Sequence, residues 1–180
     1  MTWLRRLFLW TGGVLLLLVI VAFVLPRHVH VDRSITINAP KAAVFAHING
    51  YADFNKWSPW FELDPHAKYT YEGPATGPGA KMSWVGDPST LGSGAQAITA
   101  SQADDRVDST VDFGQGAPAK QVFSLVAGAG GTKVTWGIDV DLGMNPVARY
   151  LGLMFDGMIG KDFDKGLANL KKYVEALPKS

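Results

Sequence analysis

The chain of 180 residues contains no cysteine. This absence excludes disulfides, thiolate nucleophiles and zinc sites with thiolate ligands. The chain also has almost no net charge, because 17 Lys and Arg are balanced by 16 Asp and Glu, for a formal net charge of +1. Without a basic excess, the chain lacks the electrostatic footprint of a protein that binds nucleic acid. We therefore expect no nucleic-acid partner.

Motifs for cofactor, metal or nucleotide binding are missing as well. The glycine-rich segment 128–133 carries its Thr and Lys in the reverse of the phosphate-loop order, and a predicted strand follows it. His28 and His30 share one face of a predicted strand, but the sequence offers them no third metal ligand. We expect no cofactor and no metal.

The most informative feature present is an uncharged run from Leu7 to Leu25. As a helix rising about 1.5 Å per residue it would be roughly 29 Å long, close to the hydrocarbon thickness of a bilayer. A cleaved signal peptide would have a shorter apolar core and small residues at its exit, whereas this run exits through Val24-Leu25-Pro26-Arg27-His28. A buried soluble helix would show a polar face, which this run lacks. The pattern predicts a single uncleaved anchor.

The anchor divides the chain into a cytoplasmic stub with the span, residues 1–27, and one domain, residues 28–180. Arg5 and Arg6 precede the run, and Arg27 and Arg33 follow it with Asp32 between them. This modest bias favours a cytoplasmic N-terminus and a domain on the outer side of the cytoplasmic membrane. Without Arg5, Arg6 and Arg27, 14 basic residues remain against 16 acidic ones, so the domain is nearly neutral.

The remaining pattern predicts an α+β domain. Alternation of period two predicts strands over residues 28–38, 68–72, 81–85, 94–101, 106–113, 120–127 and 132–142. Asn38-Ala39-Pro40 opens a helix that ends at Asn49-Gly50, and a short helix is expected over residues 51–56. A long helix is expected over residues 146–177, bent at Gly157 and Gly160. Seven antiparallel strands would bury their apolar face under that helix.

A set of short motifs follows in order from the first strand to the last helix. They are Ser34 to Pro40 with Val44-Phe45, Trp57 to Trp60 with Asp64-Pro65, Tyr71-x-Gly73-Pro74, Gly77-x-Gly79-Ala80, Met82-Ser83-Trp84, Gly131 to Trp136, and Phe163-x-x-Gly166-Leu167-x-x-Leu170. Their order resembles the helix-grip fold of the START-like (SRPBCC) superfamily. More narrowly, it is similar to the membrane-anchored bacterial branch of the polyketide cyclase/dehydrase family. The resemblance implies a cavity for an apolar ligand, but no particular reaction.

A cavity between sheet and helix would be lined by inward residues of the strands, by the tryptophan cluster and by the long helix. The candidates are Trp57, Trp60, Met82, Trp84, Ser109, Val111, Phe113, Phe123, Trp136, Ile138, Tyr150, Met154 and Met158. Two alternatives stay open. Trp57 and Trp60 could instead form a structural plug, and the whole interior could be a filled core.

Function can be narrowed to three hypotheses. The leading one is a membrane-anchored START-like domain that binds a lipid or another hydrophobic small molecule, and is not an enzyme. The second is a cyclase or dehydratase acting on a polyketide-like substrate, with Tyr150, Arg149 and Asp156 as the candidates for acid–base chemistry. Arg149 and Asp156 are, however, also typical of a solvated helix face. The third is an interaction module at the membrane, whose protein partners the sequence does not identify.

Overall fold

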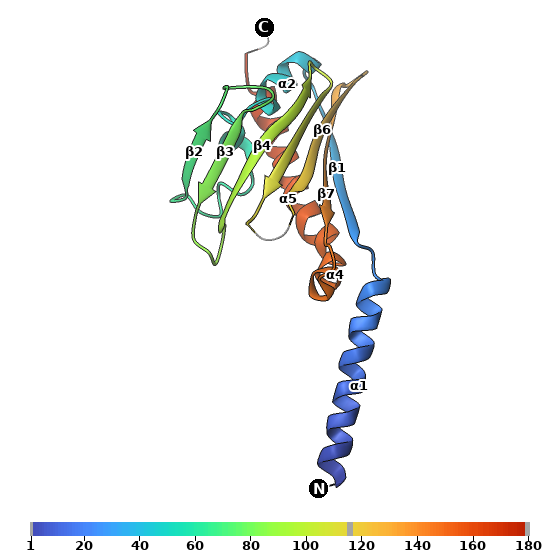
Figure 1. Ribbon diagram of the computed structural model, residues 1–180. Coiled ribbons are helices and arrows are strands. Elements are labelled where there is room, and N and C mark those ends of the chain that lie inside the picture. Colours follow the sequence, from blue (N-terminus) through green and yellow to red (C-terminus); the bar gives the residue numbers. More distant parts are fainter. Residues whose placement is uncertain (1, 115–116, 179–180) are drawn as a thin grey trace.

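The computed structural model describes residues 2–114 and 117–178. Its helices and strands follow one another as a single isolated helix, a strand, two short helices, six strands and two final helices. They are α1 (Thr2–Val24), β1 (His28–Ile37), α2 (Lys41–Ile48), α3 (Phe54–Trp57), β2 (Lys68–Glu72), β3 (Lys81–Val85), β4 (Ser93–Gln102), β5 (Arg106–Asp112), β6 (Ala119–Gly128), β7 (Gly131–Asp141), α4 (Pro146–Gly152) and α5 (Phe155–Glu175). Helix α1 projects away from the rest of the molecule, which is built around one sheet (Figure 1).

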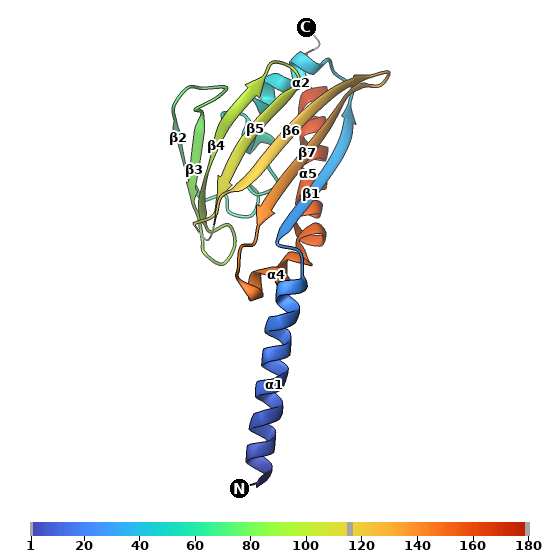
Figure 2. The same ribbon diagram turned by 45° about the vertical axis from the view of Figure 1, so that its right-hand side comes forward.

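The sheet has seven strands in the order β1-β7-β6-β5-β4-β3-β2, and every pairing is antiparallel. Each strand from β2 to β7 pairs with its neighbour in sequence, and β1 then pairs along the whole of β7, from His28 opposite Asp141 to Ile37 opposite Thr132. Helix α5 packs across β1 and β7, and covers one face of the curved sheet (Figure 2). This is the predicted helix-grip architecture.

The hydrophobic core lies between that face and the helices. Strand residues alternate between buried and exposed, as in β5, where Val107, Ser109 and Val111 are buried and their neighbours are not. Helix α5 contributes Phe163, Leu167, Leu170 and Val174, which recur at intervals of three and four residues. The inner face of the sheet is therefore the face that the period-two pattern predicts.

The C-terminal helical stretch is interrupted earlier than expected. The predicted bend at Gly157 and Gly160 is wrong, because both residues lie inside the continuous helix α5. The chain instead breaks at Leu153 and Met154, whose backbone N–H groups donate to the carbonyls three residues back, Tyr150 and Leu151. These tight turns end α4 and allow it to point away from α5.

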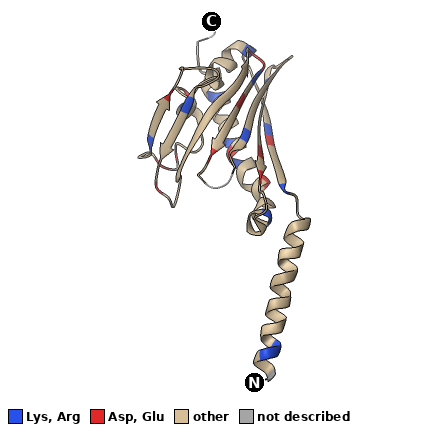
Figure 3. Ribbon diagram, in the orientation of Figure 1, with Lys and Arg blue, Asp and Glu red and all other residues tan. Residues whose placement is uncertain are grey.

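Helix α1 is apolar along almost its whole length. The helix from Trp3 to Val24 is long and apolar enough to cross a membrane, and its side chains are largely exposed. Basic residues occur on it only near its N-terminus, at Arg5 and Arg6 (Figure 3). Three residues, Leu25 to Arg27, connect it to β1.

Candidate functional site

A stack of aromatic rings fills the space between β6, β7 and α5. Trp136 lies between Phe123, with ring centroids 4.9 Å apart, and Phe163, with centroids 4.1 Å apart, and the planes are nearly parallel to its own. Trp57 meets Trp136 edge to face at 5.7 Å. Such contacts add stability beyond the buried area alone. Side chains of the protein itself therefore fill this part of the interior.

Trp57 and Trp60 take different positions although only two residues separate them. Trp57 is fully buried against Phe123 and Trp136. Trp60 is half-buried, stacks on Phe54 and donates its indole N–H to Asp162 Oδ2 at 3.2 Å. Trp60 also meets Trp136 and Phe163 edge to face, at 5.5 and 6.4 Å. Both tryptophans therefore pack on the aromatic stack, and Trp60 also ties the segment after α3 to α5.

Polar side chains gather on the inner face of the neighbouring strands β4, β5 and β6. Gln96, Ser109 and Gln121 are all buried there, and Gln121 Nε2 donates to Ser109 Oγ at 3.3 Å across the β5–β6 pair. The Tyr51 hydroxyl faces Ser109 without reaching hydrogen-bonding geometry. Burial raises the pKa of Tyr51, and the Ser109 hydroxyl opposes that shift only in part. The phenol therefore keeps its proton and remains a donor.

Several buried polar atoms around this group have no hydrogen-bond partner among the described residues. They are Tyr51 Oη, Asn55 Oδ1 and the indole nitrogens of Trp57, Trp84 and Trp136. A buried polar group left without a partner costs roughly 1–3 kcal/mol. Most buried polar groups in proteins are paired for that reason. The interior therefore offers N–H and O–H donors within apolar surroundings.

The other predicted strand residues lie on the same inner face. Met82, Trp84, Val111 and Ile138 are all buried. Phe113 lies just beyond the end of β5, is exposed, and meets Trp84 edge to face at 6.2 Å. The structure thus brings together the predicted residues of β3 to β7, with Phe113 at the rim.

The predicted residues of the helical stretch are not part of this group. Tyr150, Met154 and Met158 lie at the end of the domain that adjoins α1, and both methionines are exposed. The Tyr150 hydroxyl donates to the carbonyl of Leu18, in α1, at 2.7 Å. Tyr150 contacts α1, and both methionines are exposed, so none of the three belongs to the buried polar group.

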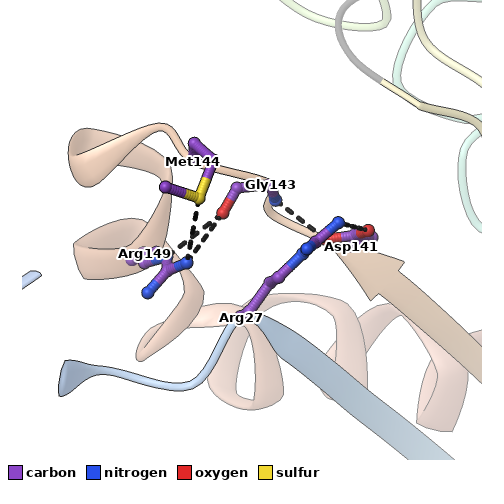
Figure 4. Close-up of polar contacts among 5 residues, drawn as sticks. All are labelled: Arg27, Asp141, Gly143, Met144 and Arg149. Atoms are coloured by element: carbon purple, nitrogen blue, oxygen red, sulfur yellow. Dashed lines mark hydrogen bonds and ion pairs between the residues drawn. The ribbon is translucent and has the colours of Figure 1, made fainter. Parts of the chain in front are cut away.

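Arg149 is a buried residue that binds the C-terminal end of α1. Only 6% of it is exposed, and its Nη1 donates to the carbonyls of Ala22, Phe23 and Leu25 at 3.4, 3.1 and 3.3 Å. Nε and Nη2 donate to the carbonyl of Gly143 (Figure 4). Because the last carbonyls of a helix lack partners within it and carry partial negative charge, a guanidinium is well suited to this position.

Asp156 is exposed and ion-paired with Arg33, with Arg33 Nη1 2.9 Å from Asp156 Oδ1. This pairing lowers the pKa of Asp156, so the carboxyl is a poor proton donor near neutral pH. Arg33 also approaches Asp164, at 3.4 Å. Tyr150, Arg149 and Asp156 therefore have separate structural partners, and they do not form an acid–base constellation around a shared space.

A second arginine pair, which no sequence motif indicates, fixes the start of β1. Arg27 donates through Nε and Nη2 to both oxygens of Asp141, each at 2.7 Å (Figure 4). Asp141 also accepts the backbone N–H of Gly143. The Arg27 guanidinium, and then the Gly143 N–H, hold the pKa of Asp141 well below its usual range. Together with Arg149, this pair fastens both sides of the connection between α1 and the sheet.

Two hollows in the surface lie outside the interior. One, of about 370 Å³, is lined by Leu9, Trp10, Gly13, Val14 and Leu17 along α1. The other, of about 360 Å³, lies over the outward residues of β2 to β5, among them Ser83, Ala95 and Thr110. Within the described part of the chain, no group of three or more His, Asp or Glu residues is placed to hold a metal ion.

Solved structures with the same architecture are numerous, and all those cited here have low sequence identity. Protein CV1439 from Chromobacterium violaceum is 18% identical, with a TM-score of 0.55 over 84% of this chain and 99% of that one. SA2116 from Staphylococcus aureus is 11% identical, with a TM-score of 0.63 over 82% and 94%. Ara h 8.0201 is 16% identical, with a TM-score of 0.55 over 83% and 99%.

These likenesses show that the domain has the helix-grip fold. At such identities they establish the fold alone. The sequence itself matches the family described as polyketide cyclase / dehydrase and lipid transport over residues 28–175, so the chain belongs to that family. No curated protein matches it.

Proposed function

We propose that this protein binds a lipid or a similar hydrophobic molecule between its sheet and α5, while α1 anchors it in a membrane. The observation that carries the proposal is the set of unpartnered N–H and O–H donors buried between the sheet and the helices, contributed by Tyr51, Trp57, Trp84 and Trp136. A ligand with an apolar body and one oxygen-bearing end would pair with such donors and leave its chain among apolar side chains. The family, which includes lipid transport, supports the same substrate class.

The site that we propose lies on the β3–β6 side of the aromatic stack. Ser109 and Gln121 form its polar floor, with Tyr51 and the indole of Trp84 as further donors. The stack of Trp57, Phe123, Trp136 and Phe163 would form its wall. Of the predicted cavity residues, Met82, Val111 and Ile138 would supply apolar contacts, and Phe113 would lie at the entrance.

The anchored position follows from α1 and the short connection after it. The helix from Trp3 to Val24 would cross the cytoplasmic membrane once, with residues 28–180 forming the domain beyond it. The two arginines near the N-terminal end of this helix, Arg5 and Arg6, favour an outward-facing domain. Lipid is then the most abundant apolar ligand within reach of the site.

Native mass spectrometry of the full chain, released from detergent, tests the binding site. The protein is measured after lipid extraction and again after addition of oleic acid. We expect a bound apolar molecule in the wild-type protein. Ser109→Leu should lower its occupancy by about tenfold, equivalent to roughly 1.4 kcal/mol, because the larger side chain fills the site. Gln121→Met, which keeps the volume but removes the amide, should also lower it.

Thr110→Leu is the matched control, because Thr110 follows Ser109 in β5 and faces the outer hollow. Lipid that merely adheres to α1 would be retained equally by all variants. Equal occupancy in the wild type and the Ser109, Gln121 and Thr110 variants would contradict an interior site. Thermal unfolding of each variant reports whether the fold itself was kept.

A further inference from the structure

Outside α1, exposed large apolar side chains are concentrated on one segment, around α4. They are Met144, Val147, Leu151, Leu153, Met154 and Met158, each between 52% and 67% exposed. From Gly143 to Met158 the two charged residues are Arg149, whose guanidinium is turned toward α1, and Asp156, which is paired with Arg33. A surface facing water seldom gathers so many large apolar groups, and such patches mark contact sites.

This segment is held beside the last turns of α1. Arg149 binds the carbonyls at the end of that helix, and its guanidinium lies over the Phe23 ring at 5.2 Å. The Tyr150 hydroxyl reaches back to Leu18. At about 1.5 Å per residue, Leu18 lies roughly 9 Å before the end of α1 at Val24. Two views show α4 next to the upper end of α1, below the sheet (Figures 1 and 2).

We propose that α4, with Leu153, Met154 and Met158, inserts into the interface of the bilayer that α1 spans and forms a second membrane contact. This inference rests on the proposed anchoring by α1. A bilayer that surrounds α1 as far as Val24 also surrounds whatever is bonded to Leu18. Interfacial segments bury their apolar side chains about 5–10 Å into the boundary of the acyl chains, which matches the depth of Tyr150. Tyrosine is a residue that favours this level.

The occupant of the apolar patch is thus lipid. Arg149 can be present in this layer because α1 carbonyls and the Gly143 carbonyl take up its donors. The two contacts, span and patch, fix the tilt of the sheet relative to the membrane. They also keep the adjoining ends of β1 and β7, paired at His28 and Asp141, next to the headgroups.

Cysteine labelling tests this arrangement cleanly, because the natural chain has no cysteine. We would introduce Leu151→Cys, Leu153→Cys, Leu17→Cys and Val126→Cys one at a time into the full chain. Each variant would be labelled with an environment-sensitive fluorophore and reconstituted into phosphatidylcholine–phosphatidylglycerol vesicles. All four positions are exposed to a similar degree, between 52% and 62%. Leu17 reports the span. Val126 lies two residues before the end of β6, next to the β6–β7 turn, and that end of β6 and β7 is the one away from α1 (Figure 1).

Quenching by lipids with a spin label on the upper acyl chain is the measurement. We expect quenching at Leu151 and Leu153 to be several-fold stronger than at Val126 and comparable to that at Leu17. Strong quenching at Leu17, with Leu151 and Leu153 no different from Val126, would overturn the insertion of α4 and leave the anchor intact. Absence of quenching at Leu17 would overturn the anchor itself, and with it the insertion.

Discussion

At the scale of single residues, Arg149 is the clearest departure from what the sequence indicates. An arginine in a predicted helix is expected to be a solvated cation or, if it lies inside a cavity, a candidate catalytic group. Its actual partners, the carbonyls of Ala22, Phe23 and Leu25, lie 124–127 residues away in sequence. Backbone acceptors leave no trace in residue type, so no pattern around Arg149 could have revealed the contact.

Asp141 gives a prediction about how the stability of the fold changes at low pH. Its pKa is lowered in the folded protein by Arg27, so the ionised carboxylate stabilises the fold above its unfolded pKa of about 3.9. That contribution is lost as the pH falls through the folded pKa. We expect Asp141→Asn to unfold at a lower urea concentration than wild type near pH 7. This gap, the difference in the urea midpoint of unfolding between wild type and variant, should begin to narrow below about pH 4.

Tryptophan fluorescence during urea unfolding at a series of pH values measures this gap. The pair is exposed, so the gap should be small. Arg27→Gln removes the same pair from the other side and should give the same pH profile. A gap that stayed constant from neutral pH down to about pH 2 would show that the carboxylate does not act through its ionisation.

At the scale of elements, the glycines of α5 serve different purposes. A Cβ built on Gly166 would lie 2.6 Å from Trp136 Cζ3 and 3.1 Å from Pro59 Cδ, so the helix backbone must contact the aromatic stack directly. A Cβ on Gly160 would lie 2.1 Å from Arg33 Nη2. A Cβ on Gly157 would meet nothing within 4 Å. Of the three positions, Gly166 needs glycine for close packing, because Trp136 and Pro59 are buried, whereas the neighbour of Gly160 is the end of a flexible arginine side chain.

Alanine substitution at two of these positions should therefore change stability in opposite directions. Gly166→Ala should lower the free energy of unfolding by about 1–3 kcal/mol, because overpacking against Trp136 and Pro59 outweighs the gain in helix propensity. Gly157→Ala should raise it by up to about 1 kcal/mol. Urea unfolding of both variants checks the pair. A stabilised Gly166→Ala would mean that α5 can shift off the stack.

Sequence periodicity located all seven strands and their inner face, because burial on one side of a sheet imposes alternation on every strand. It failed at the break between α4 and α5. Gly157 and Gly160 predict a bend because glycine is a poor helix former, but glycine inside a helix can also allow another group to approach the helix backbone closely, as Arg33 does at Gly160. The real break falls at Leu153 and Met154, which are good helix formers, because α4 is held against α1. That tertiary contact overrides local preference.

The candidate site was predicted unevenly for the same reason. Inward strand residues such as Met82, Ser109 and Trp136 follow from period two and lie where the pattern placed them. Tyr150, Met154 and Met158 also follow an apolar stripe, but apolar spacing does not tell a helix face that meets a sheet from one that meets lipid. The buried donor group containing Tyr51 depends on side chains from α3, β5 and β6 and on the segment before α3, which only the tertiary fold brings together.

At the scale of the whole molecule, orientation in the membrane rests on few charges. Arg5 and Arg6 are the basic residues at the N-terminal end of α1, and Arg27, which follows the helix, is paired with Asp141. Replacing Arg5 and Arg6 with glutamine should weaken the charge bias that orients α1 and give a population of chains with mixed orientation. Alkaline phosphatase fused after Ser180 should be active in the parent chain and lose a substantial part of its activity in Arg5→Gln/Arg6→Gln.

The control for this prediction removes two exposed cations far from the span, in Lys133→Gln/Lys172→Gln, and should leave the reporter activity unchanged. A cytoplasmic reporter fused at the same position should show the reciprocal pattern. Phosphatase activity that is absent from the parent chain would place the domain in the cytoplasm and reverse the proposed topology.

The connection of three residues between α1 and β1 has a quantitative consequence for affinity. A site tethered this closely experiences its surroundings at an effective concentration that reaches the millimolar range even for flexible linkers. A dissociation constant near 1 mM, about 4 kcal/mol of binding free energy, would then be enough to keep the site substantially occupied. Weak binding of this kind permits rapid release, so a lipid could exchange between the site and the leaflet many times without any additional energy source.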